Sequence, residues 1–206
     1  MEDEARKTTK RRIFETAVAQ FAEMGFRGTS MRSIARAVGI KESSLYNHFP
    51  GKDAILDAIL DYQLEGLREA MLTREEMEEG AAGRTDPTEI WLEGVFDFMK
   101  RLPPLTEPIN RILHNEMYVD ERCRRFVLEK LLPAQKEMTE ILLGDLLARG
   151  FLKDFDIPRI SARYVYMMHG LGMENTLLAF AGRDPDEIRR NQREHIAFFL
   201  EGLKAS

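Results

Sequence analysis

Apolar residues recur every three or four positions along most of this chain, which is the spacing of helices that bury one face. Ile13, Ala17 and Phe21 repeat at four-residue intervals, and the helix that they predict ends near Gly25, a residue suited to a left-handed C-terminal position. The sequence lacks the alternating runs of β-branched residues that indicate strands. We therefore expect an all-α fold.

A second, shorter helix is predicted directly after this one. Ser30 is placed to cap it, apolar residues within 34–38 form its buried face, and Gly39 provides the turn at its end. A complete capping box would have Glu or Gln three residues after the cap, whereas this chain has Ser33. We expect the cap to be incomplete for that reason.

A third short helix is predicted from Lys41 or Glu42 to about His48. At 100° per residue, Leu45 and Phe49 fall on its core side, and an arc of roughly 140° on the other side is wholly polar. The polar arc is made of Ser43, Ser44, Asn47 and His48. Such side chains can exchange hydrogen bonds with base edges and phosphates. The alternative interpretation is an ordinary solvent-exposed face.

The pattern in the rest of the chain predicts six further helices, which brings the total to about nine. The stretch at 121–149 contains Pro133, which should kink or split it, and the stretch at 158–181 is apolar nearly all round, so it should be buried on two sides. The acidic run within 75–79 and the loop at 80–87 separate the first two stretches. The predicted ranges are 52–71, 87–101 with Asp86 as cap, 109–116, 121–149, 158–181 and 186–204.

Charge divides the chain into two parts. Residues 1–52 hold ten Lys and Arg against six Asp and Glu, whereas residues 53–206 hold twenty against twenty-nine. Within 6–52 the balance reaches +7. A basic N-terminal part on an acidic body suggests that only the N-terminal part approaches a polyanion, and the basic run at 6–12 could act as an arm for phosphates.

Several classes of function find no support in the sequence. The N-terminus lacks the apolar core of a signal peptide and no apolar run reaches the roughly 18 residues of a membrane helix, so we expect a cytoplasmic protein. The single cysteine, Cys123, lies among three arginines that could lower its pKa, but we interpret it as an incidental thiol. No phosphate loop or HExxH motif is present, so we expect no enzyme.

The four histidines lack the spacing of a metal site, both with one another and with Cys123, so we expect no metal and no resident cofactor.

Residues 9–60 resemble the N-terminal helix-turn-helix of the TetR family of transcriptional regulators. The spacing from Ile34-Ala35 through Tyr46 and Phe49 to Lys52 is specific, and beyond residue 60 only the length and architecture match. The matching residues are Ala17, Phe21, Gly25, Phe26, Ile34, Ala35, Gly39, Ile40, Leu45, Tyr46, His48, Phe49 and Lys52.

The resemblance implies a role for each matching polar position. Ser30, Tyr46 and Lys52 would bind phosphates, and Arg32 would reach a base edge or a phosphate. The polar arc of Ser43, Ser44, Asn47 and His48 would face the major groove, with Asn47 the best base reader because its amide can pair bidentately with adenine. Lys41 departs from the Ser or Thr cap common in the family, which leaves the start of the third helix open and adds a cation near the DNA.

The resemblance also implies an organisation for the whole chain. Residues 1–52 would form a helix-turn-helix DNA-binding domain, with its motif at 30–49, and residues 53–206 a helical domain for ligand binding and dimerisation. We expect a homodimer through the last two helices that binds a palindromic DNA operator. It would act as a repressor released by a small molecule.

The identity of that small molecule lies beyond the sequence. Apolar and amphipathic residues on the helices that would surround a pocket are candidates for its contacts, with ordinary core packing as the alternative. These candidates are Trp91, Phe98, His114, Met117, Tyr164 and Met168. A helical scaffold or interaction protein without specific DNA binding explains the C-terminal two-thirds equally well, but it does not explain the polar face at 43–48 beside Arg32 and Lys52.

Overall fold

The computed structural model describes residues 2–71, 73, 75–76, 79, 83 and 85–205, without the side chains of 2–7, 179, 180 and 185. Parts of three sequence-based predictions lie outside the described residues: the basic side chains at 6–7, Glu78 of the acidic run, and most of the loop at 80–84. Every regular element in the described part is a helix, and one isolated bridge pairs Leu152 with Lys204.

The chain divides into two compact units that are each built from separate stretches of sequence. Unit 1 comprises residues 1–70 and 102–131, and unit 2 comprises residues 71–101 and 132–206. The predicted boundary at residue 52 separates DNA binding from ligand binding. It does not coincide with the division into units, and it stays a prediction.

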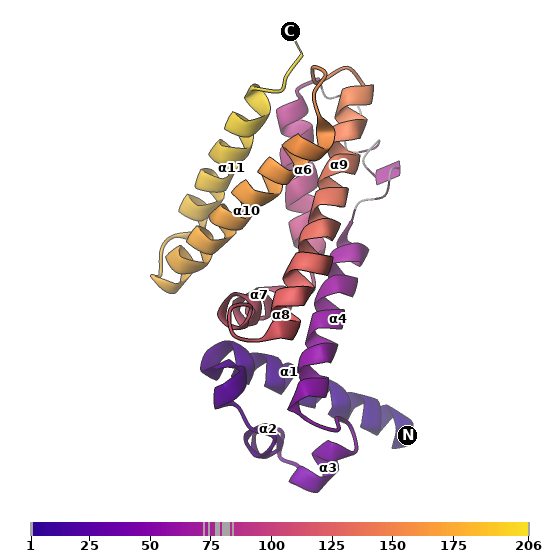
Figure 1. The fold of residues 1–206 in the computed structure, drawn as a ribbon, viewed down its shortest axis with the longest axis vertical. Helices are drawn as coiled ribbons and strands as arrows, with labels where there is room; N and C mark the ends of the chain where they lie inside the picture. Colours follow the sequence, from indigo (N-terminus) through magenta and orange to yellow (C-terminus); the bar gives the residue numbers. More distant parts are fainter. Residues whose placement is uncertain are drawn as a thin grey trace. The chain divides into compact units, whose positions relative to one another are not determined.

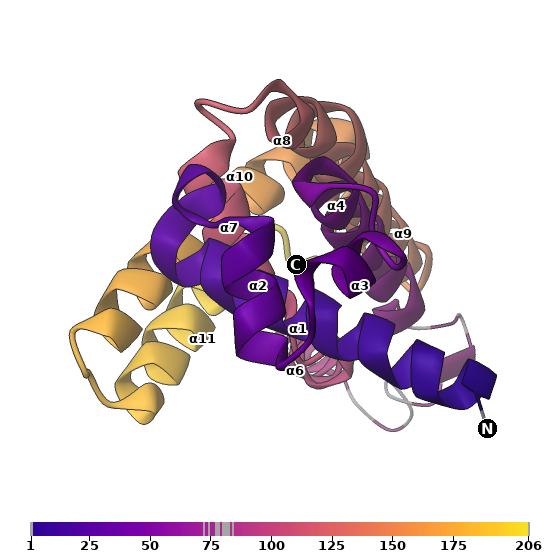
Figure 2. The same cartoon turned by 90° about the horizontal axis from the view of Figure 1, so that it is seen from below.

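Unit 1 contains the N-terminal helices together with two helices from the middle of the chain (Figures 1 and 2). Helix α1 packs on α2 and α7, and α4 packs on both α1 and α7. The elements are α1 (Glu2–Gly28), α2 (Met31–Val38), α3 (Glu42–Tyr46), α4 (Lys52–Ala70), α7 (Thr106–Glu116), α8 (Glu121–Phe126) and the π-helix η1 (Val127–Leu131).

Gly25 interrupts α1 as the sequence predicts, but in a different conformation from the one expected. Its φ of 76° is positive, while its ψ of 162° lies outside the left-handed helical region and is accessible essentially to glycine alone. The break turns the next amide toward α7, where the Phe26 N–H donates to Oε1 of buried Glu116 at 2.8 Å.

The cap of α2 corrects one expectation from the sequence. Ser33 N–H donates to Ser30 Oγ at 3.0 Å, and Ser30 N–H donates to Ser33 Oγ at 3.1 Å, so the capping box is complete. The prediction of an incomplete cap was wrong because a serine hydroxyl at the third position reaches the amide as a carboxylate would. Gly39 ends the helix in the left-handed conformation, as predicted.

Close packing joins α4 to the segment that precedes α7. A Cβ on Gly66 would lie 2.8 Å from Cδ of Pro103 and closer still to its Cγ. Buried Gln63 of α4 donates from its amide to Oδ1 of Asn110 at 3.1 Å. The absence of a side chain at residue 66 therefore permits the approach of residues 102–116 to α4.

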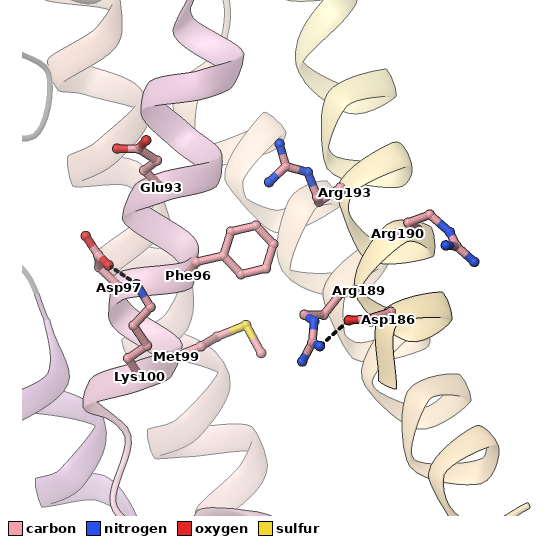
Figure 3. A pocket seen from close by; sticks show the side chains of 9 residues that line it. All are labelled: Glu93, Phe96, Asp97, Met99, Lys100, Asp186, Arg189, Arg190 and Arg193. Atoms are coloured by element: carbon pink, nitrogen blue, oxygen red, sulfur yellow. Dashed lines mark hydrogen bonds and ion pairs between the residues drawn. The ribbon is translucent and has the colours of Figure 1, made fainter. Parts of the chain in front are cut away.

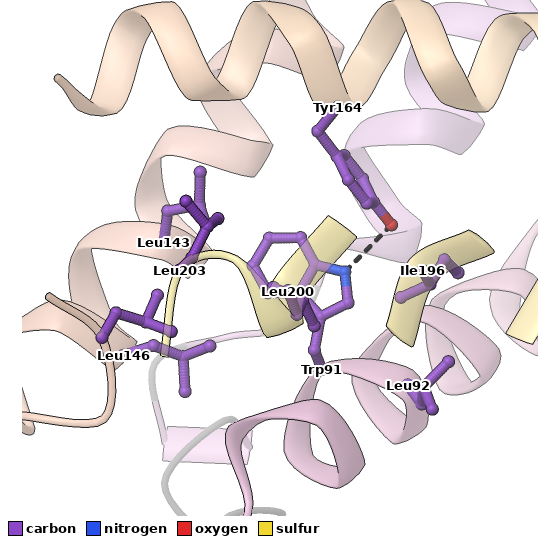
Figure 4. Close-up of a cluster of buried hydrophobic side chains, with 9 residues drawn as sticks. Trp91, Leu92, Leu143, Leu146, Tyr164, Ile196, Leu200 and Leu203 are labelled. Carbon is purple, nitrogen blue, oxygen red and sulfur yellow. Dashed lines mark hydrogen bonds between the residues drawn. The ribbon is translucent and has the colours of Figure 1, made fainter. Parts of the chain in front are cut away.

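Unit 2 consists of four long helices around an apolar cluster (Figure 4). These are α6 (Pro87–Arg101), α9 (Leu132–Ala148), α10 (Ile157–Phe180) and α11 (Pro185–Glu201), with α10 packed on α9 and α11 packed on α6. The buried cluster is composed of Trp91, Leu92, Leu143, Leu146, Leu152, Tyr164, Ile196, Leu200 and Leu203.

Pro133 splits the long helix at 121–149 as predicted. Proline lacks the N–H for an intrahelical bond and its ring crowds the carbonyl of the preceding turn. The chain responds by widening one turn into η1 between α8 and α9. Counting α8, η1 and α9 as one interrupted helix, the described residues hold the nine helices that the sequence predicts.

The bounds of the helices from α3 onward agree with the pattern to within three residues. Helix α6 begins at Pro87 after the Asp86 cap, whose Oδ1 accepts from Thr88 N–H at 2.9 Å. Helix α7 begins at Thr106 rather than near Ile109. No helix in the described ranges is long and apolar enough to cross a membrane.

Helix α10 has one side on which apolar residues are exposed. Tyr166, Met173 and Leu177 are between 57% and 62% exposed along this side, and Gly170 lies among them with open space around it. On α11, Phe198 is 85% exposed. We name these five residues the α10–α11 face.

Candidate nucleic-acid interface

Helix α3 exposes the polar side that the sequence predicts and buries the opposite side. Leu45 is fully buried and Phe49 nearly so, whereas Tyr46 is 48% exposed. Of the polar arc, Ser43 and Asn47 are exposed and Ser44 and His48 are half-buried. The arc therefore presents hydroxyl, amide and imidazole groups at or near the surface of unit 1.

Lys41 occupies the N-cap of α3, which answers the question that the sequence left open. Its backbone is extended, its carbonyl accepts from Ser44 N–H at 3.0 Å, and its side chain makes no capping bond. The helix thus begins at Glu42, and the exposed Lys41 side chain is left for contacts outside the helix.

Lys52, predicted to bind phosphate, is held within unit 1 by its ammonium group. Nζ donates to the carbonyl oxygens of Phe26 at 2.6 Å and of Thr29 at 2.8 Å, and it lies 4.3 Å from the centre of the Phe26 ring. These carbonyls belong to the end of α1 and to the turn before α2, where a cation compensates the negative end of the helix dipole. One of the three ammonium protons remains for another acceptor.

Other cations of the predicted basic arm also serve helix ends and aromatic rings. Arg12 donates to the carbonyl of Val38 at 2.6 Å, at the end of α2. Arg11 pairs with Glu15 at 2.7 Å, and Lys10 lies 5.4 Å from the centre of the Phe49 ring. Lys10 and Arg12 therefore help to fix α1 against the segment after α3 and against α2, whereas Arg11 pairs within α1.

The first turn of α2 carries two of the predicted site residues. Ser30 is exposed, and its hydroxyl oxygen accepts from the amide of Ser33 as the N-cap. Arg32 is exposed one residue into the helix. Both side chains lie at the surface, as contacts to a backbone phosphate require.

Arg122 is a functional candidate that reasoning from the sequence missed. At the start of α8 it pairs with Asp120 at 2.9 Å and with Asp53 of α4 at 2.8 Å, and its guanidinium lies 5.3 Å from the Phe26 ring. The hydrogen bonds that Arg122 donates to Asp120 raise the pKa of Arg122 and lower the pKa of Asp120. No local pattern could have revealed it, because Asp53 and Arg122 are far apart in the sequence.

Cys123 is not a reactive thiol. The side chain is fully buried, and burial raises its pKa to about 12 despite the neighbouring Arg122. The alternative of a thiol activated by arginines is therefore wrong, because desolvation outweighs the cation. Among the residues that the structure describes, no three His, Cys, Asp or Glu side chains form a group that could hold a metal ion.

The six predicted ligand contacts fall in both units. Trp91, Phe98, Tyr164 and Met168 belong to unit 2, whereas His114 and Met117 belong to α7 and its end in unit 1. Trp91 Nε1–H donates to Tyr164 Oη at 2.9 Å within the buried cluster (Figure 4). Burial raises the pKa of Tyr164 above its ordinary value. Trp91 and Tyr164 thus fill the core of unit 2, and their role toward a ligand stays a prediction.

The fold and part of the sequence have known counterparts. Residues 13–59 match the family described as "Bacterial regulatory proteins, tetR family". The repressor KstR2 of Mycobacterium tuberculosis (strain ATCC 25618 / H37Rv) is 46% identical over 48 residues, which cover 23% of this chain and 24% of that protein. The match thus spans about a quarter of the length of that curated relative.

Solved structures extend the likeness to nearly the whole chain. A putative TetR-family regulator from Mesorhizobium loti MAFF303099 has a TM-score of 0.68 at 17% identity, over 97% of this chain and 98% of that one. A putative transcriptional regulator from Saccharomonospora viridis, solved in complex with choline, has a TM-score of 0.64 at 16% identity, over 97% and 100%. At these identities the solved structures establish a shared fold. The match at residues 13–59 establishes the N-terminal helix-turn-helix. Residues 13–59 thus match the TetR family of bacterial regulatory proteins, and the chain as a whole shares the fold of such regulators.

Proposed function

We propose that this protein is a homodimeric repressor that binds a palindromic DNA operator and is released from it by a small molecule. The observation that carries the proposal is α3 with the turn that follows it, where Leu45 and Phe49 are buried and a polar arc lies at or near the surface beside exposed Tyr46. Side chains of this kind read base edges when a helix enters the major groove. Its place of action would be the cytoplasm, where the operator is.

The proposed contacts divide into positioning and reading. Ser30, Tyr46 and the remaining proton of Lys52 would hold phosphates, with Arg32 and Lys41 as further cations at the surface. The arc of Ser43, Ser44, Asn47 and His48 would face the bases. Phosphate contacts fix the register without reading sequence, whereas base contacts supply specificity.

The α10–α11 face supports the proposed dimer. Exposed apolar side chains that cluster on two helices mark an interaction surface, and a second copy of the same face would cover them in a four-helix arrangement. Gly170 leaves room for a close approach of the partner helix. The two helix-turn-helix motifs of such a dimer would reach DNA half-sites about one helical turn apart, or a multiple of that.

Release by a small molecule is proposed from the fold. The regulator from Saccharomonospora viridis with this fold holds choline, so such a fold accommodates small molecules. A ligand that favours a spacing of the heads unsuited to the operator would shift the population off DNA, and a coupling of a few kcal/mol suffices.

Selection of bound duplexes from random DNA would identify the operator, and fluorescence anisotropy at fixed salt would then test the site. Tyr46→Ala should weaken binding about tenfold on every selected sequence, because it removes a phosphate contact. Asn47→Ala should relax the preference at one base pair, where a lost base contact is worth about 1–3 kcal/mol.

Tyr118→Ala is the matched control for this test, since Tyr118 is a 76% exposed tyrosine of unit 1 outside the helix-turn-helix at 30–49. It should leave DNA binding unchanged. If Tyr46→Ala bound the operator as tightly as the parent, the assignment of the DNA-binding surface would be wrong. If no sequence were enriched, the scaffold interpretation would replace the repressor.

The dimer can be tested by the mass in solution at micromolar concentration. Phe198→Glu and Leu177→Glu place charges in the α10–α11 face, so both should produce monomers. Leu128→Glu is the control, because Leu128 is 59% exposed on η1 and should leave the dimer mass unchanged. A monomeric parent protein would contradict the proposal.

A further inference from the structure

A groove with an apolar floor and a cationic wall lies within unit 2, between α6 and the first half of α11. Its volume is about 990 Å³, close to the upper end of the range of small-molecule sites. Phe96 and Met99 extend from α6 toward α11, and the guanidinium of Arg193 extends from α11 toward α6 (Figure 3). None of the six ligand contacts predicted from the sequence lines this groove.

Two of the four cations along the groove pair with carboxylates of their own helix. Lys100 pairs with Asp97 at 2.8 Å, and Arg189 pairs with Asp186 on the same helix. Arg193 instead lies 5.6 Å from the centre of the Phe96 ring and has no carboxylate partner among the described interactions. Its guanidinium therefore keeps its donors for a ligand while its flat face rests beside an aromatic ring.

Arg190 adds a second cation at the outer edge. It lies three residues before Arg193 on α11, and its side chain points away from α6 (Figure 3). It can attract an anion into the groove, but in this conformation it does not reach the floor. We therefore expect Arg193 to make the principal contact and Arg190 a weaker one.

The balance of charges selects a singly charged ligand. Four cations and three carboxylates line the groove, so a single negative charge is matched and a polyphosphate would meet Glu93, Asp97 and Asp186. The apolar floor requires an apolar body: Phe96 is half-buried, and Met99, 44% exposed, has a flexible side chain that adapts to irregular shapes. A carboxylate also matches the fork of a guanidinium.

We infer that this groove binds an amphipathic monocarboxylate, with its aliphatic or aromatic body on Phe96 and Met99 and its carboxylate on Arg193. Such a ligand would lie between two helices of unit 2 and pull the start of α11 toward α6. As an effector site the groove rests on the proposed function, whereas as a binding site it is independent of DNA binding.

The test uses decanoate and, as an uncharged probe of equal chain length, 1-decanol, each titrated into the full-length protein by calorimetry. Decanoate should bind at least tenfold more tightly than decanol. Arg193→Gln should remove that preference by weakening decanoate about tenfold, and Arg190→Gln should weaken it about twofold to threefold. Arg183→Gln, at an arginine paired with Glu187 outside the groove, should change neither.

A second readout locates the ligand. With methyl-labelled methionine, decanoate should shift the resonance of Met99, assigned through Met99→Leu, and should leave those of Met167 and Met168 unchanged. Shifts at Met167 and Met168 instead would place the ligand in the apolar cluster and overturn the inference. Equal affinities for decanoate and decanol would also overturn it.

Two further outcomes distinguish this inference from dimerisation through the groove and from the proposed repressor function. If Arg193→Gln altered the dimer mass and the parent did not bind decanoate, a second copy of the chain would occupy the groove and the inference would be wrong. Failure of operator binding in the parent would overturn the proposed function, whereas decanoate binding that depends on Arg193 would uphold the groove.

Discussion

Both units have an apolar core, but they differ in the polar side chains that bind helix ends. In unit 1, charged and polar side chains bind helix ends: Arg12 at α2, Lys52 at α1 and Glu116 at the amide that follows Gly25. In unit 2, the contacts among α6, α9, α10 and α11 are chiefly those of the apolar cluster. Hydrogen bonds are directional and apolar contacts are not. The bonds to helix ends therefore add directional contacts to the apolar core of unit 1.

The largest expected effect compares two helical glycines, one in each unit. Gly66→Ala should destabilise the protein by roughly 2–3 kcal/mol, because the new Cβ overlaps the Pro103 ring and α4 must shift. Gly144→Ala in α9 meets only Cδ1 of Ile157 at 3.9 Å and should stabilise by about 0.5–1 kcal/mol. Urea denaturation measures both, and equal effects would remove the contrast between the units.

The next effect tests the hydrogen bond between Trp91 and Tyr164 within the apolar cluster of unit 2. Tyr164→Phe removes the acceptor of the buried Trp91 N–H and should cost about 1–2 kcal/mol. Tyr118→Phe is the control, since Tyr118 is 76% exposed and lies outside the α10–α11 face, and it should change stability by less than about 0.5 kcal/mol. A cost above that of Gly66→Ala would show that unit 2, too, depends on a directional bond.

The smallest effect is a pH dependence in unit 1. The hydrogen bond from Arg122 lowers the pKa of Asp120 below its unfolded value of about 3.9, so the pair stabilises the fold above that pH and is lost as the pH falls through the folded pKa. Asp120→Asn keeps a capping oxygen but removes the charge, and should cost about 1 kcal/mol at pH 7. The difference from the parent should shrink below about pH 4, and a constant difference would exclude the ion pair as its cause.

Helix bounds could be predicted because their causes are local. Ser30, Gly39, Asp86 and Pro133 act on the backbone within one turn of their own position. The same local logic predicted the buried and exposed sides of α3, since a helical wheel needs only a few residues.

The parts that escaped prediction depend on distant residues. Lys52 is predicted to bind a phosphate. The sequence did not show that its ammonium group also donates hydrogen bonds to two carbonyls more than 20 residues earlier in the chain. His114 and Met117 stay predicted ligand contacts, but the sequence did not show that residues 102–131 join the N-terminal helices in unit 1. Spacing along the sequence cannot show that the middle of the chain returns to its beginning.

The contact between Phe26 and Glu116 bears on how hybrid regulators could be assembled. A chimera that takes residues 1–52 from this chain and the remainder from another regulator would carry the Gly25 break but lose the carboxylate that accepts the Phe26 N–H. It would also lose Arg122, the arginine beside the same phenylalanine ring. A transplantable head therefore consists of residues 1–70 together with 102–131, two segments that must be grafted as a pair.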